Sequence, residues 1–287
     1  MSASSTPPIA ASDAVGREMR SHDVLRLVWV NALEATLDLS GTALKDGDPL
    51  PIGWHWVFFH TVEPLSALGV DGHPRPGAFL PAAPSARRMW AGGRLQIRVP
   101  LRIGERVERR STIHAVSEKA GASGLLRLVT VRHHLSSASG GDVVEDQDIV
   151  YRESAPARAF ARRSTPLPAL CHHPDVTRLI QPSAVQLFRY SALTFNAHRI
   201  HYDADYARTD EGYPGIIVHG PLVATFLLEL LRAAANTRPV REFSYRALNP
   251  LILGETLEVC ARTDGERVSL WATGPGGIVI MTAEALV

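Results

Sequence analysis

The nonapeptide "PLRIGERVE" (residues 100–108) returns as "PLILGETLE" (residues 250–258), and this repetition decides the fold. Five of the nine residues are identical, and the apolar positions match. Gly104 and Gly254 hold the same place in the two copies, where a turn that enters a strand needs the backbone freedom of glycine. A copy at half the chain length indicates a duplicated unit, because one sheet alone would leave a face or an edge uncovered.

The first half begins with helical periodicity and ends with strands. Residues 22–39 have helical apolar spacing, and the run "WHWVFF" (residues 54–59) is predicted to be buried. Residues 69–93 are rich in Pro and Gly, which favours an ordered, irregular loop over a helix. The strand-like segments of this half are residues 94–100, 105–116, 125–135 and 144–152.

The second half repeats this plan. Residues 183–195 are predicted to be helical, and a longer helix is predicted from residue 222 to about residue 234. The strand-like segments that follow are residues 242–248, 255–262, 267–273 and 278–286. The predicted organisation is therefore a flexible tail (1–21), a first unit (22–153), a Pro-, Ala- and Arg-rich linker (154–180) and a second unit (181–287).

The composition is typical of a soluble globular protein and gives no reason to expect several kinds of partner. Hydrophobic residues make up 45% of the chain and charged residues 21%, as in globular proteins. A net charge of +1 gives no electrostatic reason to expect nucleic acid or a membrane surface. Cys171 and Cys260 lack metal-site spacing, so reduced thiols in the cytoplasm are expected. The start has no secretory apolar region, and no 18-residue apolar run predicts a membrane span.

The helix predicted over residues 222–234 is apolar or small on nearly every side, which indicates burial on all sides. It begins with the sequence Val218-His219-Gly220-Pro221. A helix N-terminus presents uncommitted N–H groups and partial positive charge, so a carbonyl oxygen near Gly220 would be polarised there. The alternative is that Gly220 only allows a tight turn before a buried helix.

The segment "NAHRIHYD" (residues 196–203) crowds two histidines and an aspartate behind an asparagine. A histidine beside a carboxylate or an amide can exchange protons near neutral pH. The alternative is a hydrogen-bonded structural histidine. The His-x-x-His-x-Asp spacing offers three metal ligands, but no firm helix places both imidazoles on one face and no fourth ligand is apparent, so we predict no metal. The other paired histidines, at 133–134 and 172–173, receive no role.

Longer stretches resemble a known family. "LTFNAHRIHYDADYA" (residues 193–207) and "YPGIIVHGPLVATFLLELL" (residues 213–231) resemble the MaoC-like hydratases and dehydratases, which have the hot-dog fold. In that fold an antiparallel sheet wraps a long central helix. Residues 71–105 resemble the branch with mitochondrial 3-hydroxyacyl-thioester dehydratase type 2 and the mesaconyl-C4-CoA and itaconyl-CoA hydratases. The resemblance implies an α+β double hot-dog.

The resemblance also implies residue roles. His201 stands at the family's catalytic histidine, and Asn196 stands where the family usually carries a catalytic aspartate. An amide holds water but cannot deliver a proton, so either His201 is the sole acid/base or another group completes the pair. Gly220 matches the glycine whose amide binds the thioester oxygen, and Asp203 matches a positioning residue. The further substrate-contacting candidates are His198, Arg199 and His219.

The first half has no counterpart of these motifs, which implies one active site per chain and a degenerate first unit reshaped to receive the acyl group. The segment "RRMWAGG" (residues 87–93) is expected to line that pocket or to contact CoA phosphates. The alternative is an arginine pair on a surface turn.

The implied function is a lyase that reversibly adds water to an enoyl-CoA, with a short branched or dicarboxylic acyl group such as mesaconyl-C4 or itaconyl. A 3-hydroxyacyl-ACP or -CoA dehydratase of fatty acid metabolism is the alternative within the class. A hot-dog thioesterase would need a carboxylate base, and Glu229 is the only acid on the central helix. A non-catalytic acyl-CoA-binding module is the third reading. No GxGxxG or P-loop is present, so no cofactor is expected beyond the CoA of the substrate, and a homo-oligomer stays open.

Overall fold

The computed structural model describes residues 14–39, 43–75, 79–81, 86–121, 124–153, 162, 173–235 and 238–287. The first half contains β1 (Glu18–Val24), α1 (Leu27–Leu37), η2 (Trp54–Val57), η3 (Leu65–Ala67), β2 (Ala86–Val99), β3 (Arg106–Gly121), β4 (Gly124–Ser137) and β5 (Asp142–Glu153). The second half contains β6 (Val176–Ile180), α2 (Ala184–Thr194), η5 (Arg199–His201), α3 (Ala204–Thr209), α4 (Gly220–Ala234), β7 (Glu242–Ala247), β8 (Leu257–Asp264), β9 (Arg267–Thr273), η6 (Pro275–Gly277) and β10 (Val279–Leu286).

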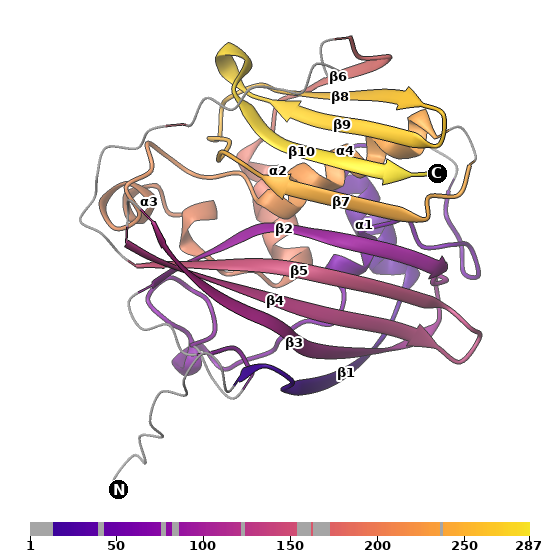
Figure 1. Ribbon diagram of the computed structural model, residues 1–287, viewed down its shortest axis with the longest axis horizontal. Coiled ribbons are helices and arrows are strands. Elements are labelled where there is room, and N and C mark those ends of the chain that lie inside the picture. The colour runs from indigo at the N-terminus through magenta and orange to yellow at the C-terminus, as the bar shows by residue number, and fades with distance from the viewer. Residues whose placement is uncertain are drawn as a thin grey trace, which may run out of the picture.

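The strands form one ten-stranded sheet with the order β1-β3-β4-β5-β2-β7-β10-β9-β8-β6 (Figure 1). From the two ends of the sheet toward its centre, β1 corresponds to β6, β3 to β8, β4 to β9, β5 to β10 and β2 to β7. Each first-half strand therefore has a second-half counterpart at the equivalent place. The antiparallel pairing of β2 with β7 joins the two halves at the centre of the sheet. The topology therefore confirms the duplication inferred from the repeated nonapeptide.

The two nonapeptides form equivalent turns with equivalent backbone hydrogen bonds. Gly104 and Gly254 have φ angles of 87° and 95°, which only glycine adopts readily. Leu101 accepts a hydrogen bond from the amide of Leu50 (2.8 Å), and Leu251 accepts one from Val218 (2.9 Å). This equivalence places the single turn of η2 where the second half has the 15-residue helix α4. The first unit has thus lost its central helix.

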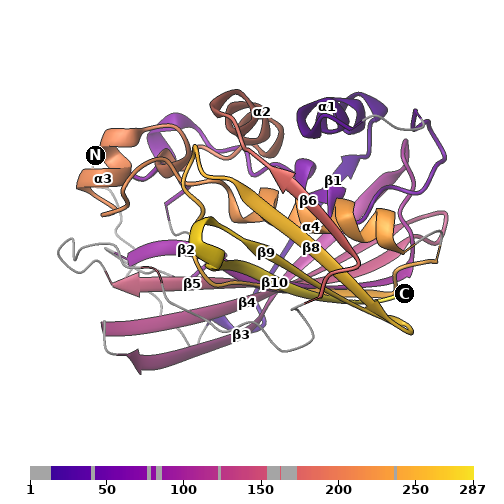
Figure 2. The same cartoon turned by 90° about the horizontal axis from the view of Figure 1, so that it is seen from above.

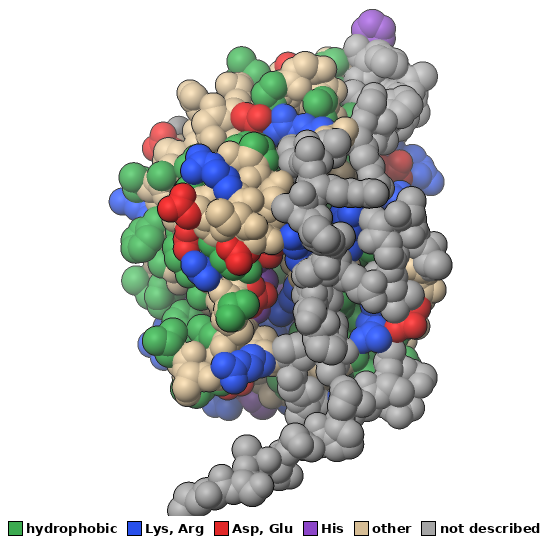
Figure 3. Space-filling model, turned by 90° about the vertical axis from the view of Figure 1, so that its left-hand side faces the viewer, with side chains coloured by type: hydrophobic (Ala, Val, Ile, Leu, Met, Phe, Trp, Pro, Cys, Tyr) green, Lys and Arg blue, Asp and Glu red, His purple; other side chains and the backbone are tan. Residues whose placement is uncertain are grey.

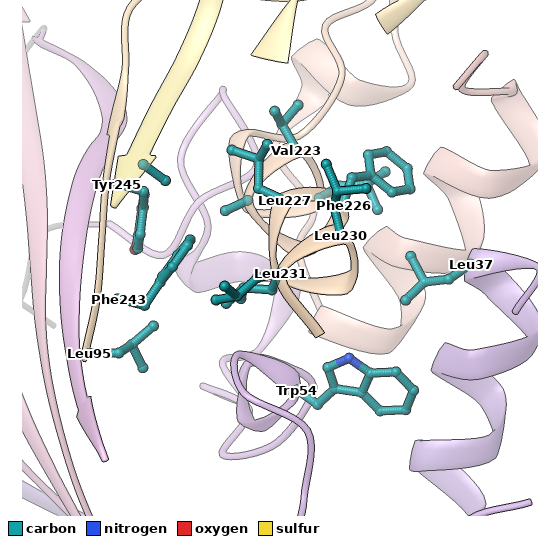
Figure 4. Close-up of a cluster of buried hydrophobic side chains, with 14 of the residues drawn as sticks. Leu37, Trp54, Leu95, Val223, Phe226, Leu227, Leu230, Leu231, Phe243 and Tyr245 are labelled. Atoms are coloured by element: carbon teal, nitrogen blue, oxygen red, sulfur yellow. The ribbon is translucent and has the colours of Figure 1, made fainter. Parts of the chain in front are cut away.

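The remaining central helix, α4, lies between the sheet and the layer formed by α1 and α2 (Figure 2). Its ten residues from Leu222 to Leu231 are all buried, as the uniformly apolar sequence predicted. Figure 4 shows α4 side chains facing Phe243 and Tyr245 of β7 on one side and Trp54 of η2 on another. The first half therefore supplies part of the packing around the one central helix.

Three boundaries differ from the sequence prediction. Strand β1 begins at Glu18, inside the predicted tail, and β6 lies inside the predicted linker. Both are edge strands without a buried residue, so they lack the apolar alternation by which strands are recognised. Strand β2 begins at Ala86, inside the predicted loop, because its first residues pair with β5. Residues 1–13 and most of the predicted linker lie outside the described residues. Among the described helices, none is long and apolar enough to cross a membrane.

Candidate active site

A cavity of about 1310 Å³ receives side chains from both halves of the chain. Its wall includes His73, Trp90, His198, His201 and Gly220. The first two come from the first half, the next two from the segment between α2 and α4, and Gly220 is the first residue of α4. The cavity therefore brings the start of the central helix and the histidine-rich motif to one space.

His201 has a fixed orientation and a fixed tautomer. Its Nδ1–H donates to the carbonyl oxygen of Ile217 at 2.8 Å, which leaves a lone pair on Nε2. Its ring stacks on His219 with centroids 3.7 Å apart. Burial, and then the neighbouring His219, hold the pKa of His201 well below its usual value of 6.5. At neutral pH His201 is therefore an uncharged hydrogen-bond acceptor.

His219 lies directly before the helix α4 and is completely buried. Its Nε2 is 2.8 Å from the hydroxyl oxygen of Ser191, and burial lowers its pKa to about 3. Gly220, the first residue of α4, has no intrahelical acceptor for its N–H. A Cβ at Gly220 would lie 3.3 Å from Cε3 of Trp90, so a side chain here would crowd the indole. The structure thus places a bare amide and a neutral imidazole on one cavity wall.

Two predicted helpers of His201, Asn196 and Asp203, make their hydrogen bonds to other groups. Asp203 caps α3 by accepting from the amide of Tyr206 (2.9 Å) and pairs with Arg199 at 2.7 Å. Asn196 accepts a hydrogen bond from the amide of His198 at 3.0 Å. The carbonyl of Ile217 is the Nδ1 partner of His201, so Asp203 does not hold the ring by that nitrogen, and a positioning role for Asp203 stays a prediction. Asn196 does line the cavity, whereas Arg199 is held by Asp203 and by the carbonyl of Val70 (3.1 Å).

His73 also lies on this wall and was not predicted from the sequence. His73, in the loop between η3 and β2, hydrogen-bonds to Asp71 at 3.0 Å and packs on His198 with ring centroids 4.2 Å apart. His198 in turn makes an edge contact with His201, at 5.5 Å between centroids. The His-Asp spacing in "DGHP" was the available signal, but nothing in the sequence indicated which motif it would meet.

The segment "RRMWAGG" lies near the start of β2. One of its arginines contacts Glu211, and other residues of the segment line the cavity. Arg87 donates to the carbonyls of Asp210 and Glu211 and pairs with the carboxylate of Glu211 at 3.3 Å. Arg88 and Trp90 line the cavity, which confirms the pocket-lining reading for part of the segment.

A second buried polar cluster lies at another part of the cavity wall. Glu145 accepts from His55 (2.9 Å) and from the indole of Trp56 (2.9 Å). Burial raises the pKa of Glu145, but the attraction and hydrogen bond of His55 outweigh it and bring the pKa to about 2. His133, which received no predicted role, is buried against Ser111 (2.7 Å) and also lines the cavity.

Figure 3 shows the end of the molecule that carries α3. Among the described residues drawn there, Lys and Arg side chains alternate with Asp and Glu side chains. This mixture matches the near-neutral charge of the chain.

Comparisons with known proteins agree with this architecture. The family model of hydroxyacyl-thioester dehydratase type 2 matches residues 53–253. Mesaconyl-C(4)-CoA hydratase of Chloroflexus aurantiacus is 43% identical over 270 residues, covering 94% of this chain and 95% of that protein. The structure of a MaoC-like dehydratase from Phytophthora capsici has a TM-score of 0.69 at 16% identity and covers 97% of both chains. A double hot-dog protein of Mycobacterium tuberculosis has a TM-score of 0.54 at 14% identity, covering 96% and 97%.

The duplicated sheet around one central helix, together with these likenesses, defines a double hot-dog protein of the hydratase and dehydratase class, a hydro-lyase. The chain belongs to the hydroxyacyl-thioester dehydratase type 2 family. The predicted resemblance, fold and enzyme class are confirmed, and the roles of individual residues stay predictions.

Proposed function

We propose that this enzyme reversibly adds water across the C2=C3 double bond of an enoyl-CoA, with His201 as an acid/base group and the Gly220 amide as the site for the thioester oxygen. The observation that carries the proposal is the placement of both groups on one cavity wall, with the Nε2 lone pair of His201 left free by the bond to Ile217.

The proposed mechanism follows from these two groups. Water donates a hydrogen bond to Nε2 of His201, and its oxygen attacks C3 as a proton is removed. The π electrons move toward the thioester, and the N-terminus of α4 stabilises the charge that develops on the thioester oxygen. The resulting enolate takes a proton at C2. The steps use imidazole and backbone amide groups, with CoA carried by the substrate, so the proposal includes neither a metal nor another cofactor.

The acyl group that we propose is short and dicarboxylic or branched, such as mesaconyl-C4 or itaconyl. The hydratase relative, named for mesaconyl-C(4)-CoA, supports this choice. The second carboxylate of a dicarboxylic acyl group needs a cation, and among the described residues three arginines line the cavity: Arg75, Arg88 and Arg109. Arg109 is partly buried, and this burial lowers its pKa. A 3-hydroxyacyl dehydratase acting on CoA or acyl carrier protein is the second candidate, supported by the family that the chain matches.

A thioesterase is disfavoured by the place of Glu229. Its carboxylate accepts from Trp54 at 2.8 Å and pairs with Arg232 at 2.6 Å. Burial raises the pKa of Glu229, and the residue is not on the wall of the cavity. The helix α4 therefore presents no carboxylate base to the cavity. The compartment that we propose is the cytoplasm, with an organelle as the alternative because of the mitochondrial branch of the family.

A panel of enoyl-CoAs tests the proposal. Crotonyl-, longer-chain, mesaconyl-C4- and itaconyl-CoA are each mixed with enzyme, and the loss of the conjugated thioester absorbance is followed. Hydration of at least one dicarboxylic substrate is expected, together with a fall in kcat of about 100-fold or more for His201→Ala. Release of free thiol without hydration would establish a thioesterase instead. Turnover that survives His201→Ala would show that the acid/base assignment is wrong.

A further inference from the structure

We propose that the Asp71–His73 pair, delivered from the first half, carries the transferred proton at this site while His201 holds the attacking water, and that the pair takes the role that Asn196 cannot fill. The inference rests on the proposed hydration reaction and names residues that the catalytic motif of the second half does not contain. It gives the degenerate first unit a direct part in the chemistry.

The pair has the geometry of a carboxylate-backed imidazole. Nδ1–H of His73 donates to Oδ2 of Asp71 at 3.0 Å, and Oδ1 of the same carboxylate accepts from the backbone amide of His73 at 3.1 Å. The carboxylate is therefore anchored at both oxygens. Nε2 of His73 keeps its lone pair, and the imidazole lies on the cavity wall. A carboxylate in this place can stabilise an imidazolium ion, as in hydrolytic triads.

The loop that carries the pair is fastened to the catalytic motif of the second half. The amide of Arg199 donates to the carbonyl of Asp71 at 2.9 Å, and the guanidinium of Arg199 donates to the carbonyl of Val70 at 3.1 Å. Gly72, with φ +89°, lies so close to Ala197 that a Cβ there would be 1.9 Å from its carbonyl oxygen. Only glycine permits this approach. Contacts of this kind hold the pair in one position relative to His198 and His201.

The imidazoles form a continuous row along the wall. One nitrogen of His73, one of His198 and one carboxylate oxygen of Asp71 all lie within 4.8 Å of one another. The rings of His198 and His201 then meet edge to face, at 5.5 Å between centroids. His198 is buried, and its Nε2 is 3.9 Å from Glu211. Proton acceptors of the first and the second half are thus neighbours in one cavity.

His73 has a carboxylate partner and His201 has none, so the proton taken from water is assigned to His73. His201 has only a carbonyl as its Nδ1 partner and stacks on a second imidazole, so an imidazolium there would gain no carboxylate. His73 has Asp71. Burial raises the pKa of Asp71, but the hydrogen bond and charge of His73 outweigh this and bring the pKa to about 2, so the carboxylate is ionised at neutral pH.

The step balances with these groups alone. Water donates one O–H to Nε2 of His201 and the other to Nε2 of His73. As the water oxygen bonds to C3, its bond to the proton at His73 breaks, and the π pair moves to the thioester oxygen at Gly220. The imidazolium of His73 then returns that proton to C2 as the enolate collapses. His73, which touches the reacting water, is a catalytic residue in this scheme, and Asp71 is a positioning residue.

The pH dependence has a defined sign. Burial, outweighing the opposing contribution of Asp71, lowers the pKa of His73 to about 4, and Arg88 and His198 lower it too. Catalysis by neutral His73 is therefore lost as the pH falls through about 4. The hydrogen bond and charge of Asp71 raise the pKa of His73, so Asp71→Asn should lower that pKa further. The acid limb of kcat should therefore move to lower pH while kcat itself falls.

The test compares Asp71→Asn and His73→Gln with His134→Gln in the full-length enzyme, using the best enoyl-CoA of the panel. His134 is a matched control, because it pairs with Asp142 at 2.9 Å on β4 and is not on the cavity wall. We expect kcat to fall about 100-fold for His73→Gln and about 10-fold for Asp71→Asn, with KM within threefold and the melting temperature near that of the wild type. His134→Gln should retain the wild-type kcat.

Several outcomes would overturn the proposal. A kcat above half of the wild-type value for His73→Gln would show that His201 acts alone, and the proposed hydratase function would stand. A rise in KM without a fall in kcat would make the pair a binding element only. Loss of wild-type activity in EDTA that zinc restores would make the cluster a metal site. Failure of the wild-type enzyme to hydrate any substrate would instead refute the function on which the inference rests.

Discussion

Substituting Gly72 by alanine isolates the contact between the two halves that the proposed chemistry requires. The new Cβ would lie 1.9 Å from the carbonyl oxygen of Ala197 and 2.8 Å from its carbon, whereas real Cβ contacts are essentially never shorter than 3.0 Å. The loop must therefore shift by about 1 Å or more. A displacement of about 1 Å at a reacting group costs on the order of 100-fold in rate, so we expect kcat of Gly72→Ala to fall about 100-fold.

The backbone conformation adds a separate cost that a control can remove. Gly72 has φ +89°, and an alanine in that region costs about 1–2 kcal/mol. Gly47 has φ +88° but nothing within 4 Å of an added Cβ, so Gly47→Ala carries the backbone strain without the collision. Both variants should lose stability in urea unfolding through the backbone cost, Gly72→Ala more because of the collision, and only Gly72→Ala should lose turnover in the absorbance assay. Equal kcat values for the two variants would refute the claim that this loop positions a reacting group.

Three further substitutions test other contacts. Asp203→Asn should lower the melting temperature slightly and leave kcat within twofold, and a tenfold loss of kcat would mean that Asp203 orients His201 after all. Glu145 has a pKa of about 2 in place of the usual 4.5, so its contribution to stability is full above pH 4.5 and is lost as the pH falls to about 2. Urea unfolding of Glu145→Gln should therefore show a weaker pH dependence in that interval, and an unchanged slope would contradict the assignment. Trp54→Phe removes the indole donor to Glu229 and should cost about 1–2 kcal/mol of unfolding free energy. A neutral effect would show that this bond does not couple η2 to α4.

Much of the fold was readable from local pattern. The repeated nonapeptide predicted the duplication, and its two glycines do adopt the left-handed conformation expected of a strand-entering turn. The uniformly apolar run after Pro221 predicted a helix enclosed on all sides, and ten consecutive residues of α4 are buried. Strands β1 and β6 escaped prediction because both are exposed edge strands, whose pairing depends on β3 and β8 and not on any periodicity of their own.

Only the site residues that belong to one contiguous motif could be predicted from the sequence. His201 and Gly220 stand in a contiguous motif, and the structure brings both to the cavity. Asp203 follows His201 by two residues, yet its carboxylate turns to the amide of Tyr206 because capping α3 satisfies a free N–H. His73 lies 125 positions before His198 in the sequence, and only the folded chain brings their rings to 4.2 Å. Local spacing carries no signal for such a contact.

The loss of the central helix from the first unit explains how that contact arises. In the second unit, α4 fills the space over its sheet, whereas in the first unit η2 ends after one turn at Val57. The chain that follows is then free to cross to the neighbouring unit, where Asp71 and Gly72 meet the segment around Ala197. A helix of the 15-residue length of α4 that began at Trp54 would take up residues 54–68, which is most of the chain that now leads to Asp71. The degeneration of one copy is therefore the structural condition for a site that both copies build.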